Sequence, residues 1–220
     1  MKDYLNWKKL IKNKSLKNVM MITSGTVLSQ VLPIVFFPIL SRIYSPSDYG
    51  ILGLFMSISM LLMVVSNLQL NYAILIPKED KEALKVLMTG LHLIGFFTAI
   101  SLLVVLLLGG FISKLLSSPS LKNWLYLIPV TVLFTGANIQ LSAWFNRTGQ
   151  FKVISTSRVV TSVVTILFSL GLSFLINGPG GLVISYLVGN LISFSVLLYS
   201  FRRTHFFYFM PIVEMKSVLH

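Results

Sequence analysis

Long charge-free runs of apolar residues alternate along the chain with short stretches that hold its charged side chains. A helix that crosses the hydrocarbon core of a bilayer needs about 20 mainly apolar residues. The last run is too long for one crossing, and its "NGPGG" stretch at 177–181 contains the Gly and Pro residues that end helices. The pattern therefore predicts six membrane-spanning helices from five runs, which cover residues 18–41, 49–77, 86–113, 123–146 and 159–201.

The runs do not show the alternation of apolar and polar residues that a transmembrane β-strand of about ten residues would show. We therefore expect an all-α integral membrane protein. A basic cytoplasmic segment, 1–18, precedes the spans, and a second cytoplasmic segment, 202–220, follows them. The expected spans cover approximately residues 19–41, 49–76, 86–111, 123–145, 159–176 and 182–201.

Composition agrees with a membrane protein and also predicts its orientation. Charged residues make up only 11% of the 220, whereas soluble domains carry about 25%. With both termini in the cytoplasm, 15 of the 18 Lys and Arg residues lie on the cytoplasmic side, and only Arg42, Lys114 and Lys122 lie outside. This bias is the usual signature of orientation. The net charge of +12 is therefore explained by topology, and we expect no nucleic-acid partner.

The first 18 residues combine lysines with apolar residues in helical spacing. Tyr4, Leu5, Trp7, Leu10 and Ile11 are the apolar members. This pattern predicts an amphipathic helix that lies on anionic membrane lipids. The apolar run that follows is longer than the core of a signal peptide and lacks a small-residue cleavage site, so it is expected to remain as the first span.

Catalytic chemistry has few candidates in this sequence. The three histidines lack the spacing of metal ligands, and the chain has no cysteine. We therefore expect no enzyme activity, no metal and no cofactor. Intramembrane acids mark ion and proton pathways, and their absence from the predicted spans argues against a cation antiporter. The carboxylates are those of Asp3, Asp48, Glu79, Asp80, Glu82 and Glu214.

Uncharged polar residues within the spans are candidate ligands for a substrate. Side-chain amides in membranes commonly form hydrogen bonds between helices. Two interpretations therefore stay open, namely helix packing and the lining of a polar cavity for sugar hydroxyls. The candidates are Gln30, Asn67, Asn71, Asn138 and Gln140.

Helix breakers and small residues complete the pattern within the spans. Pro33 and Pro38 remove backbone hydrogen bonds from the first span, so we expect them to bend it and to form a hinge or gate. Small residues let neighbouring helices approach closely. We expect this packing role for Gly25, Ser29, Gly136, Gly171, Ser173 and Gly189.

The stretch "PILSRIYSPSDYGILGLF", residues 38–55, joins the first two spans and has two interpretations. In the first, it is a capped turn, because Ser, Pro and Asp favour turns and Asp48 favours a helix start, while Arg42 extends to the membrane surface. In the second, Arg42 binds a phosphate beside a bent helix, because a guanidinium group suits phosphate recognition.

The same stretch resembles the signature between the first two spans of bacterial polysaccharide and O-antigen flippases, in the multidrug/oligosaccharidyl-lipid/polysaccharide exporter superfamily. "LSAWFNRTGQFKVISTSRVV" (141–160) and "GGLVISYLVGNLISF" (180–194) are also similar to that family. The resemblance implies a multi-pass protein of the bacterial inner membrane that flips polyprenyl-pyrophosphate-linked oligosaccharide, such as lipopolysaccharide precursors, by alternating access. It also implies that Arg42 matches a basic residue of the family's signature and that Arg147, Lys152 and Arg158 match its cytoplasmic loop. Arg42 and Arg147 are the candidate substrate-binding cations, while the loop residues can also be ordinary cytoplasmic charges.

The resemblance further implies a fold of two six-helix lobes, of which this sequence supplies one. We expect the second lobe to come from a longer chain or from a second copy, and a polysaccharide polymerase is a possible partner. Three alternatives stay open: a multidrug or cation antiporter-like transporter of the same superfamily, a membrane sugar or acyl transferase, and a non-transporting scaffold of a polysaccharide assembly complex.

Overall fold

The structure is a computed structural model, and it describes residues 14–115 and 118–204. These residues form helices and contain no strand, and six of the helices are long and apolar enough to span a membrane. The predicted all-α membrane fold is therefore confirmed. The helices are α2 (Lys14–Ile43), α3 (Pro46–Asn67), α4 (Leu70–Ala73), α5 (Asp80–Leu115), η1 (Pro119–Leu121), α6 (Lys122–Leu125), α7 (Ile128–Arg147), α8 (Phe151–Leu172) and α9 (Gly180–Thr204).

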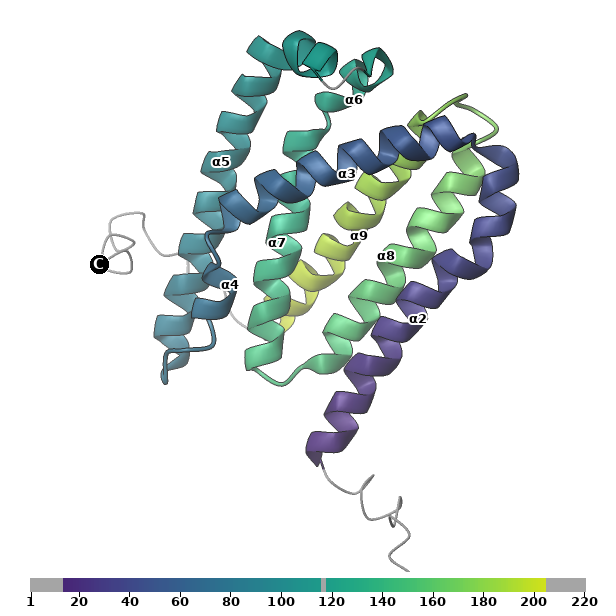
Figure 1. The fold of residues 1–220 in the computed structure, drawn as a ribbon. Coiled ribbons are helices and arrows are strands. Elements are labelled where there is room, and N and C mark those ends of the chain that lie inside the picture. The colour runs from purple at the N-terminus through teal and green to yellow at the C-terminus, as the bar shows by residue number, and fades with distance from the viewer. Residues whose placement is uncertain (1–13, 116–117, 205–220) are drawn as a thin grey trace, which may run out of the picture.

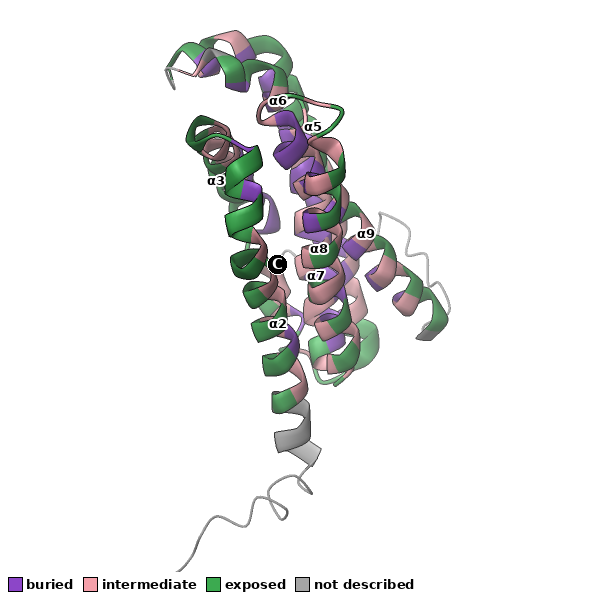
Figure 2. Cartoon of the chain, turned by 90° about the vertical axis from the view of Figure 1, so that its right-hand side faces the viewer, coloured by how far each residue is buried: buried purple, intermediate pink, exposed green. Residues whose placement is uncertain are grey.

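The predicted N-terminal amphipathic helix lies outside the described residues, as does most of the C-terminal segment. Helices α5, α7, α9, α8 and α2 follow one another side by side, and α3 crosses in front of α7 and α9 (Figure 1). Figure 2 shows α2 and α3 on one side of α7 and α8. Helix α7 is central, because it contacts α3, α5, α8 and α9.

Small residues allow close packing between neighbouring helices, as predicted for three of the four glycines. A Cβ atom at Gly25 would collide with Ser155 of α8, and one at Gly189 would collide with Thr165. Gly136 also packs closely, since a Cβ there would lie 3.2 Å from the side chain of Ile94. The expectation is wrong for Gly171, which has no neighbouring atom within 4 Å of that position.

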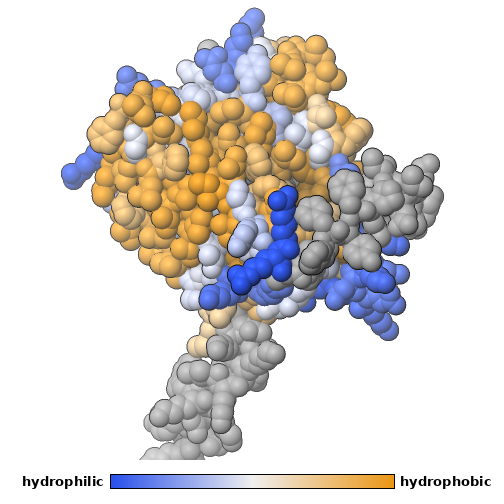
Figure 3. All heavy atoms as spheres, turned by 180° about the vertical axis from the view of Figure 1, so that it is seen from behind, coloured by the Kyte–Doolittle hydropathy of each residue, from blue (hydrophilic) through white to orange (hydrophobic). Residues whose placement is uncertain are grey.

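Successive spanning helices run in opposite directions, which brings the predicted cytoplasmic segments to one end of the bundle (Figure 1). We call it the basic end, and it contains the start of α2, the α4–α5 loop and the α7–α8 turn. The described basic residues at or near this end are Lys14, Lys17, Lys78, Lys81, Lys85, Arg147, Lys152, Arg158, Arg202 and Arg203, against Arg42, Lys114 and Lys122 near the opposite end. Apolar residues cover most of the face in Figure 3, as expected for contact with lipid.

Helix α2 contains both prolines of the first span and continues past them without a break. Figure 1 shows that the helix changes direction in its C-terminal half. Proline removes one helical hydrogen bond and clashes with the preceding turn, which is the usual cause of a kink. The Pro33 and Pro38 side chains are exposed, while Phe36 and Leu40 on the same part of the helix pack against the corner at Tyr44.

Candidate functional site

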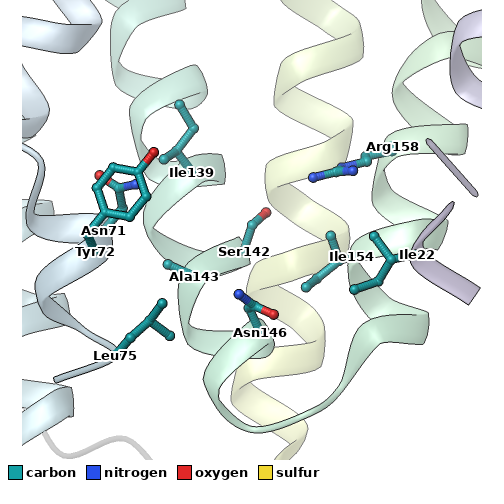
Figure 4. Close-up of a pocket in the computed structure, with 10 residues that line it drawn as sticks. All are labelled: Ile22, Asn71, Tyr72, Leu75, Ile139, Ser142, Ala143, Asn146, Ile154 and Arg158. Carbon is teal, nitrogen blue, oxygen red and sulfur yellow. The ribbon is translucent and has the colours of Figure 1, made fainter. Parts of the chain in front are cut away.

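A cavity of about 250 Å³ opens near the basic end, between α4, α7, α8 and α2 (Figure 4). We call it the basic-end cavity. Apolar side chains form much of its wall, while amide, hydroxyl and guanidinium groups supply hydrogen-bonding capacity. Its polar lining residues are Asn71, Tyr72, Ser142, Asn146 and Arg158, and its apolar ones are Ile22, Leu75, Ile139, Ala143 and Ile154.

Arg158 supplies the positive charge of this cavity. It lies on α8, seven residues after the helix begins at Phe151, which corresponds to about 10 Å along the helix axis. Its Nη1 atom donates a hydrogen bond to the hydroxyl of Thr26 on α2. The side chain is exposed, and Figure 4 shows it reaching into the cavity. A guanidinium group with four further N–H donors can therefore meet a phosphate here.

The resemblance placed Arg158 in the basic cytoplasmic loop with Arg147 and Lys152, just before a fifth span expected from residue 159, and of these three only Arg147 was a candidate ligand. Helix α8 in fact begins at Phe151, which brings Arg158 into the wall of the bundle. The sequence signal for this earlier start is Gly149, whose φ of 69° is the left-handed conformation that commonly follows the end of a helix.

Arg147, by contrast, forms its hydrogen bonds with the loop before α5. Its guanidinium donates to the backbone oxygens of Ile74, Pro77 and Lys78 at 2.6–3.3 Å, and to the carboxylate of Asp80 at 3.1 Å. The Arg147 side chain is only 12% exposed, whereas that of Asp80 is 78% exposed. In this structure Arg147 holds the α4–α5 loop against α7 and does not line the basic-end cavity.

Three of the predicted polar residues form one hydrogen-bonded chain. Gln140 of α7 is fully buried, and its Nε2 donates to Oδ1 of Asn67 at 2.6 Å. Asn67 in turn donates to Oδ1 of Asn71 at 3.3 Å. Only Asn71 lines the basic-end cavity. The packing interpretation therefore describes Gln140 and Asn67, and the cavity interpretation describes Asn71.

The hydrogen bonds between Gln140, Asn67 and Asn71 cross a break in the segment predicted as the second span, residues 49–76. Helix α3 ends at Asn67, and Leu68 and Gln69 both adopt left-handed conformations, with φ of 45° and 59°. Side chains with a Cβ atom destabilise that conformation by about 1–2 kcal/mol per residue. Neither residue is glycine, so tertiary contacts hold the break against local preference.

The remaining candidates do not join the cavity. Asn138 donates to the backbone oxygen of Asn190 at 3.0 Å, which ties α7 to α9. Gln30 is exposed on α2 and shares a helix face with Thr26 and Phe37, by the spacing of four and seven residues. Thr26 contacts Arg158 of α8 and Phe37 contacts Tyr49 of α3, so this exposed face borders both neighbouring helices.

Arg42 lies at the end of the bundle opposite to Arg158, so the structure does not bring these two cations together. It occupies the last turn of α2 and is exposed. Sixteen residues separate it from Thr26, the partner of Arg158, which corresponds to about 24 Å along α2.

The stretch around Arg42 forms a rigid corner between α2 and α3. Ser45 and Asp48 form a capping box at the start of α3, in which the Asp48 carboxylate accepts a hydrogen bond from the Ser45 backbone N–H at 2.9 Å. Tyr44 is 3% exposed and donates to the backbone oxygen of Ser169 at 2.6 Å. Burial raises the pKa of the Tyr44 hydroxyl, with smaller contributions from Tyr49 and Asp48. The capped-turn interpretation therefore accounts for this stretch apart from Arg42.

A second cavity, of about 500 Å³, lies between α3, α7 and α9. Its lining is mainly apolar and includes Met56, Met60 and Met63 of α3, with Thr135 of α7 and Tyr186 of α9. Thr135, Ser142 and Asn146 follow one another at helical spacing and therefore share a face of α7. Along that face, Thr135 at the second cavity and Asn146 at the basic-end cavity lie about 16 Å apart.

Comparison with known proteins gives one assignment. The model of the family described as "Polysaccharide biosynthesis protein" matches residues 39–219, which is most of the chain.

The chain belongs to this family.

The match includes the corner, both cavities except for Ile22 of α2, and the break after α3. No significant match was found among curated proteins or among solved structures.

The site therefore offers a charge and hydrogen-bond donors to a ligand, on an apolar wall. Within residues 14–115 and 118–204, no three His, Asp or Glu side chains lie together as a metal site. An arrangement of one guanidinium group, two amides and hydroxyl groups suits an anionic, hydroxyl-rich ligand. Such chemistry is consistent with a role in polysaccharide biosynthesis, which the family assignment shows.

Proposed function

We propose that this protein moves a lipid-linked oligosaccharide, carried on a polyprenyl pyrophosphate, across the bacterial cytoplasmic membrane. The basic-end cavity takes the headgroup from the cytoplasmic leaflet. Arg158 meets the pyrophosphate, while Asn71 and Asn146 meet sugar hydroxyls. O-antigen, capsule and exopolysaccharide repeat units all share this chemistry.

The observation that carries the proposal is the position of Arg158 in a cavity at the basic end, with its guanidinium group exposed. An unpaired charge in hydrocarbon costs many kcal/mol, so a phosphorylated headgroup needs a compensating charge and hydrogen-bond donors along its path. The cavity supplies both. Under the positive-inside rule, its end of the bundle faces the cytoplasm, where such lipids are assembled.

The path continues along the polar face of α7 toward the second cavity and ends near Arg42. Arg42 is the cation that would receive the phosphate at the opposite end, and Gln30 lies on α2 between the two ends. The second cavity has methionines, which are flexible and adapt to ligands of different shape. A second six-helix lobe, further along the chain or in a second copy, would close the side of the bundle on which α2 and α3 lie.

An antiporter-like transport of drugs or cations is the second candidate within this superfamily. The described carboxylates belong to Asp48, Glu79, Asp80 and Glu82, which all lie in or just before the first turn of a helix. A cation site would need a carboxylate at membrane depth. The geometry therefore favours an anionic substrate.

The experiment compares Arg158→Ala, Arg158→Lys and Lys152→Ala in cells whose surface polysaccharide depends on this gene. Lys152 is a matched control, because it is an exposed cation on the same helix that does not line the cavity. A lost hydrogen bond to a charged group is worth about 1.5–3 kcal/mol, which corresponds to a roughly 10- to 150-fold loss of affinity. We expect polymer to fall strongly with Arg158→Ala, partly with Arg158→Lys, and not with Lys152→Ala.

Membrane extracts probed for each variant show whether the protein is inserted at the normal level. Wild-type polymer in cells that carry inserted Arg158→Ala protein would refute the role of this cavity. Arg42→Ala, tested in parallel, reports separately on the opposite end of the path.

A further inference from the structure

The break between α3 and α4 is at odds with the sequence that forms it. No Gly or Pro lies between Gly53 and Pro77, so local preference favours one continuous helix. The structure instead has two successive left-handed residues, Leu68 and Gln69, both exposed. Exposed side chains offer little packing that would stabilise this conformation. The contacts that hold the break must therefore lie in its flanks.

Both flanks are held by α7. On the α3 side, Gln140 donates to Asn67, the last residue of the helix, at 2.6 Å. On the far side of α4, Arg147 donates to the backbone oxygens of Ile74 and Pro77 at 3.2 and 2.6 Å. Gln140 and Arg147 are seven residues apart, which places them on one face of α7, two turns from each other.

The segment between these two attachments carries cavity residues. Asn71 and Tyr72 belong to α4 and line the basic-end cavity, opposite Arg158 of α8 (Figure 4). If Leu68 and Gln69 became right-handed, α3 would continue through α4 and take these side chains to new positions. Discontinuous helices next to the substrate site are a recurrent device in membrane transporters.

We propose that Leu68 and Gln69 form a hinge between a bent and a straight form of the α3–α4 segment, and that Gln140 is the positioning residue that stabilises the bent form. Bending places Asn71 and Tyr72 at the basic-end cavity, and straightening withdraws them. The hinge stands on backbone geometry and hydrogen bonds alone, whereas its use in admitting a phosphorylated lipid rests on the proposed function.

Gln69 allows the equilibrium to be shifted in either direction at an exposed site. Glycine adopts the left-handed conformation without strain and disfavours a helix interior, so Gln69→Gly favours the bent form. A β-branched residue is a true outlier there, so Gln69→Val favours the straight form. The strain of one left-handed residue corresponds to a shift of about five- to thirtyfold in the ratio of the two forms.

The test measures distances between nitroxide spin labels in vesicles that contain the full chain. The sequence has no cysteine, so labels can be introduced at Tyr72→Cys and Thr156→Cys without removing others. Tyr72 is on α4, and Thr156 is exposed on α8. A second pair, Thr156→Cys and Tyr199→Cys, spans the packed helices α8 and α9 and serves as the control.

We expect Gln69→Gly and Gln69→Val to shift the Tyr72–Thr156 distance distribution in opposite directions, with at least a fivefold difference between them in the ratio of the forms. The control distance stays the same. Gln140→Leu shifts the distribution in the direction of Gln69→Val, and adding Gln69→Gly restores it. If Gln140 acted only by filling space in the core, Gln69→Gly would not restore the distance distribution of the Gln140→Leu protein.

One distance distribution shared by the three single variants would overturn the hinge. A shift by Gln140→Leu that Gln69→Gly fails to restore would overturn the positioning role of Gln140. Opposite shifts at Gln69 combined with normal polymer in Arg158→Ala cells would leave the hinge standing and refute the proposed headgroup site, so the two failures are distinguishable.

Discussion

Replacing Gly181 with alanine is expected to displace Tyr44 from the corner between α2 and α3. The Cβ atom would collide with the Tyr44 hydroxyl and lie 3.0 Å from Cζ and 3.2 Å from Cε1. Tyr44 fills a small cluster with Leu40 and Leu182, and its hydroxyl donates to Ser169. The ring must therefore move, because the added methyl group occupies its place.

The magnitude follows from what Tyr44 loses. The hydrogen bond is worth about 1 kcal/mol, and incomplete burial of the ring costs up to about 2 kcal/mol more. Alanine regains about 0.5–1 kcal/mol of backbone entropy relative to glycine, which offsets part of this. A net loss of about 1–2.5 kcal/mol lowers the midpoint of thermal unfolding by roughly 2–10 °C for a chain of this size.

The assay follows thermal unfolding of the detergent-purified protein by tryptophan fluorescence. Gly171→Ala is the matched control, because a Cβ at Gly171 meets no atom within 4 Å. It should leave the midpoint unchanged or raise it slightly. Tyr44→Phe removes the atom that the new methyl group meets first, so the double variant should lose less than the sum of the two single losses. A Gly181→Ala protein as stable as Gly171→Ala would refute this account of the corner.

Two further predictions concern groups outside the cavity. Arg147→Ala should lower the thermal midpoint strongly, since hydrogen bonds from a charged group are worth about 1.5–3 kcal/mol. Asp80→Asn should change it little, since exposed ion pairs contribute about 0–1 kcal/mol, and equal losses would contradict the assignment of Arg147 to the loop backbone. Because the pKa of Tyr44 is raised, its stabilising contribution is present below its ordinary value near pH 10 and is lost as pH rises through the raised pKa. Wild-type protein should therefore lose its stability advantage over Tyr44→Phe in strong alkali, and a constant difference would contradict the burial of this hydroxyl.

The six helices were predictable from the sequence, because hydropathy alone decides which segments can lie in lipid. The corner was also predictable in part, since Ser45 and Asp48 carry a local capping signal that needs no tertiary contact. The break at Leu68 and Gln69 was not predictable. Asn67, the residue just before it, accepts a hydrogen bond from Gln140, which lies more than 70 residues away in the chain.

The site residues, too, include some that the sequence indicated and others that depend on tertiary contacts. Asn71, a candidate from the sequence, lines the basic-end cavity, whereas Arg147 binds a loop and Arg158 lines the cavity instead. Both are basic residues close to a predicted membrane boundary, and pattern alone does not distinguish them. Arg147 is bound by backbone oxygens of a loop that folds back onto α7, and Arg158 lies inside α8 because the helix begins right after the turn at Gly149.

Transbilayer movement of the substrate tests the central proposal most directly. Vesicles containing the full-length protein and a fluorescent polyprenyl-pyrophosphate oligosaccharide are treated with an impermeant quencher, and the quenched fraction is followed over time. We expect wild-type and Lys152→Ala protein to bring labelled headgroups from the inner to the outer leaflet, and Arg158→Ala protein to bring few or none. Equal movement in Arg158→Ala and wild-type vesicles would contradict the assignment of this cavity to the headgroup.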